Sequence, residues 1–259
     1  MTSVADALAR IRCVLANTSH PGNIGSAARA LRTMGLRRLV LVSPQIFPHE
    51  QATALAAGAA EVLERAQVHA SLAPALADCH LVLGATARRR GVELDELDPR
   101  AAAQRVLEAS LAGQQVALLF GNEQSGLSNE EIQHCHAAIT IPTDPDYGSL
   151  NLAQAVQVVA WEIREAWLAR AGAPTLTASR DLPADAAQLD ALFEHLARTL
   201  DAIDFHKGRS PEMILQRLRR VFLRAELDQR EVRVLHGICA DAMRMARLAG
   251  AQLGRAGEN

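Results

Sequence analysis

The sequence predicts an α/β fold with a mostly parallel sheet, followed by a small all-helical C-terminal domain. Over residues 1–170, short runs of β-branched and aliphatic residues alternate with helical segments, which is the order expected of a parallel sheet with crossover helices. After a stretch rich in Gly, Ala, Pro, Thr and Ser, only helical patterns remain. We therefore expect a first domain over residues 1–170, a linker over 171–183 and a helical extension over 184–259.

The individual elements are predicted from the pattern of apolar residues. Apolar residues form continuous runs in buried strands and recur every three or four positions in helices. The expected strands are residues 11–17, 38–42, 80–84, 116–120 and 137–141. The expected helices are one that begins at Asn151 and residues 26–34, 55–65, 72–77, 99–112, 184–203, 211–225 and 230–253.

Composition indicates a soluble globular protein of the cytoplasm. Hydrophobic residues make up 49% of the chain and charged residues 22%, with a formal net charge of −2. No apolar run reaches the length of a membrane span, and the N-terminus lacks the apolar core of a signal peptide. The four cysteines are scattered without a C-x-x-C pair, so we expect reduced thiols. We expect no metal site, because the adjacent side chains of His134-Cys135-His136 point apart on a helix or strand.

Two segments are locally basic although the whole chain is not. Residues 1–40 contain six arginines and one acidic residue, and residues 205–235 contain eight basic residues and four acidic ones. A local patch of this kind is sufficient for contact with nucleic acid.

Two polar blocks, residues 120–128 and 148–155, follow apolar runs and mark the candidate site. Loops at the carboxyl ends of parallel strands are the usual ligand position in open α/β sheets. Asn151 and Gln154 have the spacing of a helix capping box, so Ser149 lies just before a helix N-terminus, where backbone donors can hold a polar ligand. The alternative is that Ser149 and Asn151 serve only as caps.

Two glycine patterns resemble nucleotide-binding motifs but lack their key residues. Gly22 and Gly25 are three apart, without the middle glycine of G-x-G-x-x-G, which argues against a dinucleotide site and hence an oxidoreductase. Gly121 and Gly126 have Walker A spacing, but Leu127 stands where the lysine belongs, which argues against an ATP or GTP site.

Charged residues near these loops are further candidates. Arg29, in the first helix after a glycine loop, could line a site or pair with Glu123; the alternative is that Arg29 is simply solvated. Glu123 could orient Arg29 or a substrate; the alternative is that it is a carboxylate at the start of a helix. The run Arg88-Arg89-Arg90 follows a strand end. These arginines could bind RNA phosphates, or they could be a solvated run of charges without such a role. No segment offers a Ser-His-Asp arrangement or paired hydrolase carboxylates.

Three motifs occur in order along the chain: Asn23-Ile24-Gly25-Ser26-Ala27-Ala28-Arg29, Phe120-Gly121-Asn122-Glu123 with Gly126-Leu127-Ser128, and Ser149-Leu150-Asn151-Leu152-Ala153-Gln154-Ala155. Together they resemble the SPOUT class of S-adenosylmethionine-dependent RNA 2′-O-ribose methyltransferases, in its SpoU/TrmH family. The opening Asn17-Thr18-Ser19-His20-Pro21-Gly22-Asn23, the lead-in Asp144-Pro145-Asp146-Tyr147 and the helical extension are most similar to the TrmJ group. Members of that group methylate tRNA at position 32 of the anticodon loop.

The resemblance implies a trefoil knot, a homodimer whose active site draws on both subunits, and S-adenosylmethionine as cofactor. The cofactor positions that it implies are Ala85, Thr86, Ala87, Gly121, Ile141, Gly148, Ser149 and Leu150. Ile141 and Leu150 would flank the adenine. The implied catalytic group is Arg29, with Ser149, Asn151 and Glu123.

A guanidinium gives up its proton too reluctantly to be a comfortable general base. We therefore favour a role for Arg29 in fixing the RNA phosphate and stabilising the developing alkoxide. Arg88, Arg90, Arg217, Arg219 and Arg220 would add phosphate contacts to tRNA. The alternatives are methylation of another tRNA site or of rRNA, and a non-catalytic RNA-binding homologue.

Overall fold

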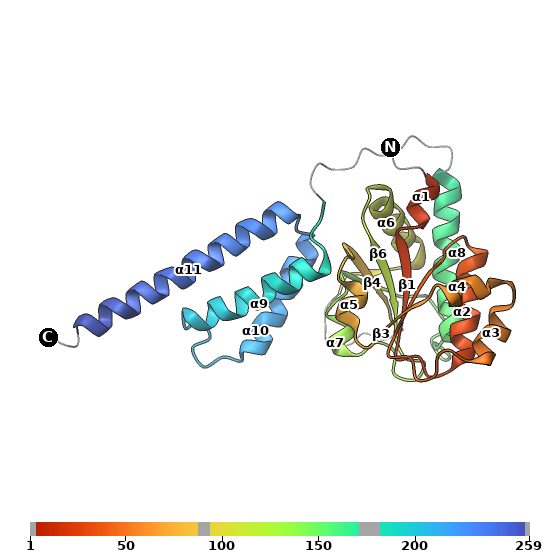
Figure 1. The fold of residues 1–259 in the computed structure, drawn as a ribbon, viewed down its shortest axis with the longest axis horizontal. Helices are drawn as coiled ribbons and strands as arrows, with labels where there is room; N and C mark the ends of the chain where they lie inside the picture. The colour runs from red at the N-terminus through yellow and green to blue at the C-terminus, as the bar shows by residue number, and fades with distance from the viewer. Residues whose placement is uncertain (1–3, 88–93, 171–181, 257–259) are drawn as a thin grey trace. The chain divides into compact units, whose positions relative to one another are not determined.

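The computed structural model describes residues 4–87, 94–170 and 182–256 and divides the chain into two units, Met1–Arg180 and Asp181–Asn259 (Figure 1). The predicted linker, residues 171–183, lies almost entirely outside the described residues. Among the described helices, none combines the length and the apolar character that a membrane span requires.

The first unit contains a seven-stranded sheet in the order β3-β2-β1-β6-β4-β7-β5, in which every pair is parallel. The strands are β1 (Ile11–Ala16), β2 (Arg38–Val42), β3 (Gln67–His69), β4 (Leu81–Ala85), β5 (Glu96–Leu97), β6 (Val116–Phe120) and β7 (Ala137–Ile139). In the central strands β1 and β6 every residue is buried, as expected of a parallel sheet covered on both faces. The predicted α/β fold with a parallel sheet is therefore confirmed.

Helices cover both faces of this sheet (Figure 1). On one face α2 packs against α8, and α8 packs against α6, while α5 and α7 lie on the opposite side. The helical elements of this unit are α1 (Val4–Leu8), α2 (Pro21–Thr33), α3 (Glu50–Ala56), the 3₁₀ helix η1 (Ala57–Ala59), α4 (Ala60–Glu64), α5 (Leu72–Leu76), α6 (Pro99–Leu111), α7 (Asn129–Ile132) and α8 (Leu152–Arg170).

Helix α2 begins at Pro21 and not at Ser26, so the predicted glycine loop is in fact the first turn of a helix. Proline suits this position because the first helical N–H needs no intrahelical partner. Gly25 allows α3 to approach closely, since a Cβ there would lie 2.1 Å from the Ala52 carbonyl oxygen. The helix predicted over 55–65 was also wrong in its bounds, because this segment is divided among α3, η1 and α4.

The second unit contains three helices among its described residues: α9 (Ala186–Ala202), α10 (Pro211–Ala225) and α11 (Gln229–Ala256). Asp185 and Gln188 form a capping box at the start of α9. A small core joins the helices, with Leu192 and Phe193 of α9, Leu223 of α10 and Val232 of α11. The predicted helical C-terminal region is confirmed.

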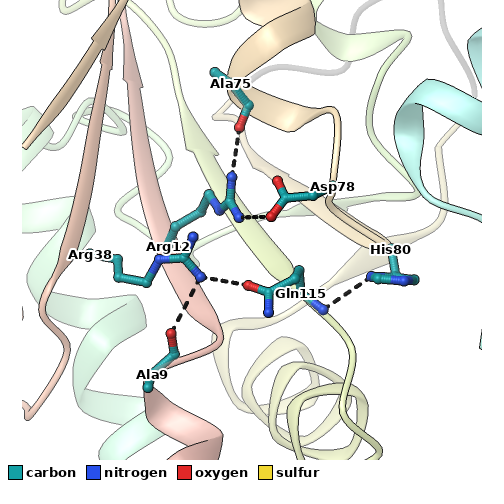
Figure 2. Close-up of polar contacts among 7 residues, drawn as sticks. All are labelled: Ala9, Arg12, Arg38, Ala75, Asp78, His80 and Gln115. Carbon is teal, nitrogen blue, oxygen red and sulfur yellow. Dashed lines mark hydrogen bonds and ion pairs between the residues drawn. The ribbon is translucent and has the colours of Figure 1, made fainter.

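A polar network connects the amino ends of four strands (Figure 2). The side chain of Arg12 in β1 is almost fully buried; its Nη2 lies 2.6 Å from Asp78 Oδ2, and its Nη1 donates to the Ala75 carbonyl at 3.1 Å. Arg38 in β2 donates to Gln115 Oε1 at 2.5 Å. These contacts add polar links between the amino ends of β1 and β2 and the segments that lead into β4 and β6.

Arg12 and Arg38 are register partners on neighbouring strands, so two positive charges lie close together. Burial and the charge of Arg12 lower the pKa of Arg38, while Asp78 acts in the opposite direction. Burial alone would raise the pKa of Asp78, but the hydrogen bond and charge of Arg12 outweigh it, and the pKa lies below its usual value. Asp78 is thus the counter-charge that makes the buried Arg12 tolerable.

Replacing Asp78 by Asn should lower the free energy of unfolding by about 2 kcal/mol, because Arg12 would keep a buried charge without its carboxylate. We expect less than for a fully buried pair, since the Asp78 side chain is 59% exposed and water can replace part of the contact. Because the folded-state pKa is lowered, the contribution is present above about pH 4 and is lost as the pH falls through the folded-state value.

Urea unfolding of the wild type and Asp78→Asn at pH 7 and pH 3 measures both effects. The control is Glu108→Gln, which removes an exposed carboxylate 2.8 Å from Arg170 and should cost less than about 1 kcal/mol. Equal losses in the two variants would contradict a special role for Asp78.

Candidate functional site

A cavity of about 510 Å³ lies at the carboxyl ends of β4, β6 and β7. Its walls are residues 85–87 after β4, residues 120–127 after β6, and residues between Ile139 and Ala155 that follow β7 and begin α8. Its volume lies within the range of roughly 300–1,000 Å³ typical of small-molecule sites. The position agrees with the predicted location at strand ends.

All eight positions expected to hold a cofactor line this cavity: Ala85, Thr86, Ala87, Gly121, Ile141, Gly148, Ser149 and Leu150. They come from three separate loops, which only the fold brings together. Their role as cofactor ligands remains a prediction.

The loop after β6 closes tightly on itself and accounts for the glycine spacing that resembled a Walker A motif. A Cβ on Gly121 would lie 2.2 Å from the Gly126 carbonyl carbon, so no side chain fits there. The Gly126 amide donates to the Asn122 carbonyl at 2.8 Å, and Gly126 has a φ of +67°, a left-handed conformation that favours glycine.

The carboxylate of Glu123, on the cavity wall, receives four hydrogen bonds from the loop between β1 and α2 and the first turn of α2. Oε2 accepts from the Ser19 amide at 2.9 Å and from the Ser19 hydroxyl at 2.8 Å. Oε1 accepts from the His20 amide at 3.2 Å and from Asn23 Nδ2 at 2.9 Å. Glu123 thus joins the loops that leave two adjacent strands, β1 and β6.

These donors determine the ionisation of Glu123. Burial would raise its pKa, but the hydrogen bonds from Asn23 and Ser19 outweigh burial and lower the pKa to about 2. Hydrogen bonds to the charged form stabilise it, so Glu123 is ionised at neutral pH. A carboxylate with so low a pKa and with both oxygens occupied is a poor proton acceptor.

The suggested pairing of Glu123 with Arg29 is wrong within the described part of the chain. The Glu123 oxygens bind the donors named above, and Arg29 forms no hydrogen bond or ion pair with any described residue. Arg29 is exposed on α2, six residues after Asn23, which is about 9 Å along a helix axis. It does not line the cavity of its own chain.

Asn151 caps α8, as the sequence predicted, and also contacts α2. Its Oδ1 accepts from the Ala153 amide at 2.9 Å, and its own amide donates to Gln154 Oε1 at 3.2 Å. Its Nδ2 donates to Asn23 Oδ1 at 2.9 Å. Asn23 therefore links Glu123 to Asn151, which lies two residues after the cavity-lining Ser149.

The predicted RNA-binding arginines differ in their surroundings. Arg88 and Arg90 lie outside the described residues. Arg217 is exposed on α10, whereas Arg219 lies 2.5 Å from Asp190 and over the Phe193 ring at 4.7 Å, which commits its guanidinium to a contact within the unit. Arg220 is partly buried on the same helix.

Ser19 and Asn23 are site residues to which the sequence assigned no role of their own, although both lie in the motifs that follow the first strand. Their partner Glu123 is about a hundred positions away, so no local pattern indicates the contact. His136 is buried, and its Nδ1 accepts from the Val82 amide at 3.1 Å. Within the described ranges, no group of three His, Cys, Asp or Glu residues could hold a metal ion.

Comparison with known proteins agrees with this geometry. The model of the SpoU rRNA methylase family matches residues 10–161, which include β1, β6 and the whole cavity. The chain belongs to the SpoU methylase family. A second model, for the C-terminal domain of the tRNA methyltransferase TrmJ, matches residues 187–251, so the predicted resemblance to the TrmJ group is confirmed as well.

Individual members of the SpoU methylase family match nearly the whole chain. The tRNA (cytidine/uridine/adenosine-2′-O-)-methyltransferase TrmJ of Pseudomonas aeruginosa is 46% identical, covering 93% of this chain and 96% of that protein. The tRNA (cytidine/uridine-2′-O-)-methyltransferase TrmJ of Escherichia coli K12 is 44% identical, covering 90% and 95%. The crystal structure of TrmJ from Z. mobilis ZM4 has a TM-score of 0.76 at 33% identity, covering 89% of this chain and 97% of that one.

Replacing Glu123 by Gln should release the loop between β1 and α2, because an amide group offers one acceptor oxygen in place of two. We expect amide hydrogen exchange at Ser19 and His20 to accelerate about tenfold, as for a loss of about 1.4 kcal/mol. Since the folded-state pKa is about 2, the wild-type contribution is present above about pH 4.5 and is lost as the pH falls toward 2.

The control is Glu130→Gln, an exposed carboxylate at the start of α7. Its exchange rates at Ser19 and His20 should equal those of the wild type. Unchanged exchange in Glu123→Gln would show that other contacts hold the loop.

Proposed function

We propose that this protein transfers a methyl group from S-adenosylmethionine to the ribose 2′-hydroxyl of cytidine or uridine at position 32 in the tRNA anticodon loop. The observation that carries the proposal is the similarity to TrmJ proteins over at least nine-tenths of the chain, through both units. Those relatives are tRNA 2′-O-methyltransferases by name. The position within tRNA comes from the resemblance to the TrmJ group. We expect the enzyme to act in the cytoplasm.

The cavity suits S-adenosylmethionine in size and in lining. Ile141 and Leu150 offer apolar surface for the adenine, and the loops at Thr86, Gly121 and Ser149 offer backbone groups for its polar edges. Gly148 leaves room beside Thr143, since a Cβ there would lie 3.2 Å from Thr143 Oγ1. The bound cofactor would supply an electrophilic methyl group.

The residues of the chain would position the ribose and balance charge. Ser149 at the cavity and Asn151 beside it would orient the hydroxyl against the methyl carbon, which is the main requirement of an in-line transfer. Arg29 would bind the RNA phosphate and stabilise the developing alkoxide. Glu123 would hold the wall, and the proton would leave through phosphate or water.

A homodimer would complete the site. Arg29 is exposed and does not line its own chain's cavity, which supports a site that takes Arg29 from a second subunit. The trefoil knot implied by the family resemblance would involve the loops after β6 and β7, whose residues wall the cavity.

The second unit would contact tRNA outside the catalytic cavity. Arg217 is exposed on α10, and Arg224 lies one to two turns further along the same helix and is also exposed. Arg219 would contribute less, because Asp190 already neutralises it. Arg88 and Arg90 stay predicted contacts.

The two alternatives are methyl transfer to a different RNA site and RNA binding without methyl transfer. The family model carries the name of rRNA methylases, which favours rRNA or another tRNA site as the second candidate target. A non-catalytic RNA-binding homologue is the other alternative, although Arg29, Glu123, Ser149 and Asn151 are all present.

The deciding experiment is transfer of labelled methyl groups from S-adenosylmethionine to unmodified tRNA transcripts, with ribose methylation mapped afterwards. We expect label at position 32, a loss of about a hundredfold or more in Arg29→Ala for one lost charge-stabilising contact, and little recovery in Arg29→Lys, which lacks the planar fork. Arg65→Ala, an exposed arginine on the same unit, is the matched control and should retain full activity.

Label at another nucleotide or in rRNA would show that the target is not position 32 but that the reaction is still ribose methylation. Cofactor binding without label in tRNA would point to another RNA as the substrate, and no cofactor binding at all would favour the non-catalytic RNA-binding homologue. Full activity of Arg29→Lys would remove the planar-fork role.

Replacing Arg217 by Gln should raise the apparent KM for tRNA and reduce the slope of log affinity against log salt by about 1, as for one lost phosphate contact. The affinity for S-adenosylmethionine should not change. Titrations of tRNA binding at salt concentrations between about 50 and 200 mM measure this slope. Arg219→Gln should change the slope less, and an unchanged slope in Arg217→Gln would remove this helix face from recognition.

A further inference from the structure

We propose that Ser19 is a positioning residue of the cofactor site, which holds the Glu123 wall of the cavity through its hydroxyl and its amide. The inference rests on the proposed function, because it assigns Ser19 a role in binding S-adenosylmethionine. Ser19 does not line the cavity and acts only through Glu123.

Ser19 is the residue that contributes two of the four donors to the Glu123 carboxylate. Both bonds reach the same oxygen, Oε2, at 2.9 Å from the amide and 2.8 Å from the hydroxyl. Removal of the hydroxyl would leave Oε2 with one donor, while Oε1 would keep the His20 amide and Asn23. The loss would therefore fall on one side of the carboxylate and allow it to rotate.

The backbone around Ser19 is held in place independently of its hydroxyl. Asn17, two residues earlier, has a φ of +54°, and its carbonyl accepts from Asn122 Nδ2 at 2.7 Å. Its own Nδ2 donates to Glu131 Oε1 at 2.9 Å. Because these contacts remain in a Ser19 variant, the fold should persist while the Glu123 wall loosens.

Glu123 connects this loop to the cavity in two ways. Glu123 itself forms part of the cavity wall, together with Asn122 and Gln124. Its partner Asn23 also binds Asn151, at the start of α8. A negative charge fixed in the wall also suits a cofactor with a positively charged sulfonium, and the donors from Ser19, His20 and Asn23 hold that charge in place.

The test compares Ser19→Ala and Ser19→Thr with Ser43→Ala in the full-length protein. Ser43 is the matched control: it follows the adjacent strand β2, and its exposed hydroxyl donates to the Ala70 carbonyl at 2.7 Å, away from the cavity. Calorimetric titration gives the Kd for S-adenosylmethionine, and steady-state methyl transfer at saturating tRNA gives kcat and KM.

We expect Ser19→Ala to raise the Kd and KM for S-adenosylmethionine about tenfold, as for one lost hydrogen bond to a charged group, with kcat changed by less than about twofold. Protonation of Glu123 should lower the affinity for S-adenosylmethionine at acidic pH. In Ser19→Ala this fall should begin at a higher pH than in the wild type, because fewer donors stabilise the ionised Glu123 carboxylate. Ser19→Thr keeps a hydroxyl and should restore the affinity. Ser43→Ala should match the wild type.

Wild-type affinity in Ser19→Ala would overturn the inference, and so would a loss confined to kcat. If Ser19→Ala does not fold, Ser19→Cys, a weaker donor of similar shape, takes its place, and wild-type affinity there would equally overturn it. A wild type that fails to bind S-adenosylmethionine would overturn the proposed function and this inference together, whereas normal wild-type binding with an unaffected variant would overturn the inference alone.

Discussion

The carboxylate of Glu123 is the contact on which the arrangement of the candidate site depends. Strands β1 and β6 are adjacent, but the helices that follow them, α2 and α7, lie on opposite sides of the sheet, so the two loops diverge as at a topological switch point (Figure 1). Here four donors between Ser19 and Asn23 converge on one ionised side chain. The same contact fixes the start of α2 and, through Asn23 and Asn151, the start of α8. The wall of the cavity and the two helices beside it therefore share one electrostatic anchor.

The two ends of the sheet use charge differently. At the amino ends, Arg12 is buried and paired with Asp78, and its Nη1 donates to the Ala75 carbonyl, so these charges join segments of the chain to one another. At the carboxyl ends, glycines and backbone groups dominate, and the ionised Glu123 is held at the rim. Apolar burial in β1 and β6 supplies most of the stability of such a sheet, so charged residues at its ends serve mainly to select one arrangement among several compact ones.

Strands β2 and β6 were predicted to the residue because an uninterrupted apolar run makes up all of β6 and all of β2 after Arg38. The short edge strands β3 and β5 were missed, since two or three largely exposed residues produce no such run. The start of α2 was missed because Gly22 and Gly25 resemble a loop, although they serve close packing against α3. The cavity was located correctly from its strand-end glycines, whereas the contact of Ser19 with Glu123 depends on pairing across the sheet and leaves no local signal.

The ionised state of Glu123 also restricts the chemistry that this site can support. A carboxylate with a pKa of about 2 and four donors cannot accept a proton from a ribose hydroxyl at neutral pH. A guanidinium stays protonated under the same conditions. If the proposed methyl transfer is correct, these two groups contribute charge and position, and the proton must reach solvent or the RNA itself. Rate should then depend on how closely Arg29 and the phosphate approach the ribose. If Arg29 comes from a second subunit, as proposed, the geometry between subunits, and not the basicity of any side chain, is the decisive variable.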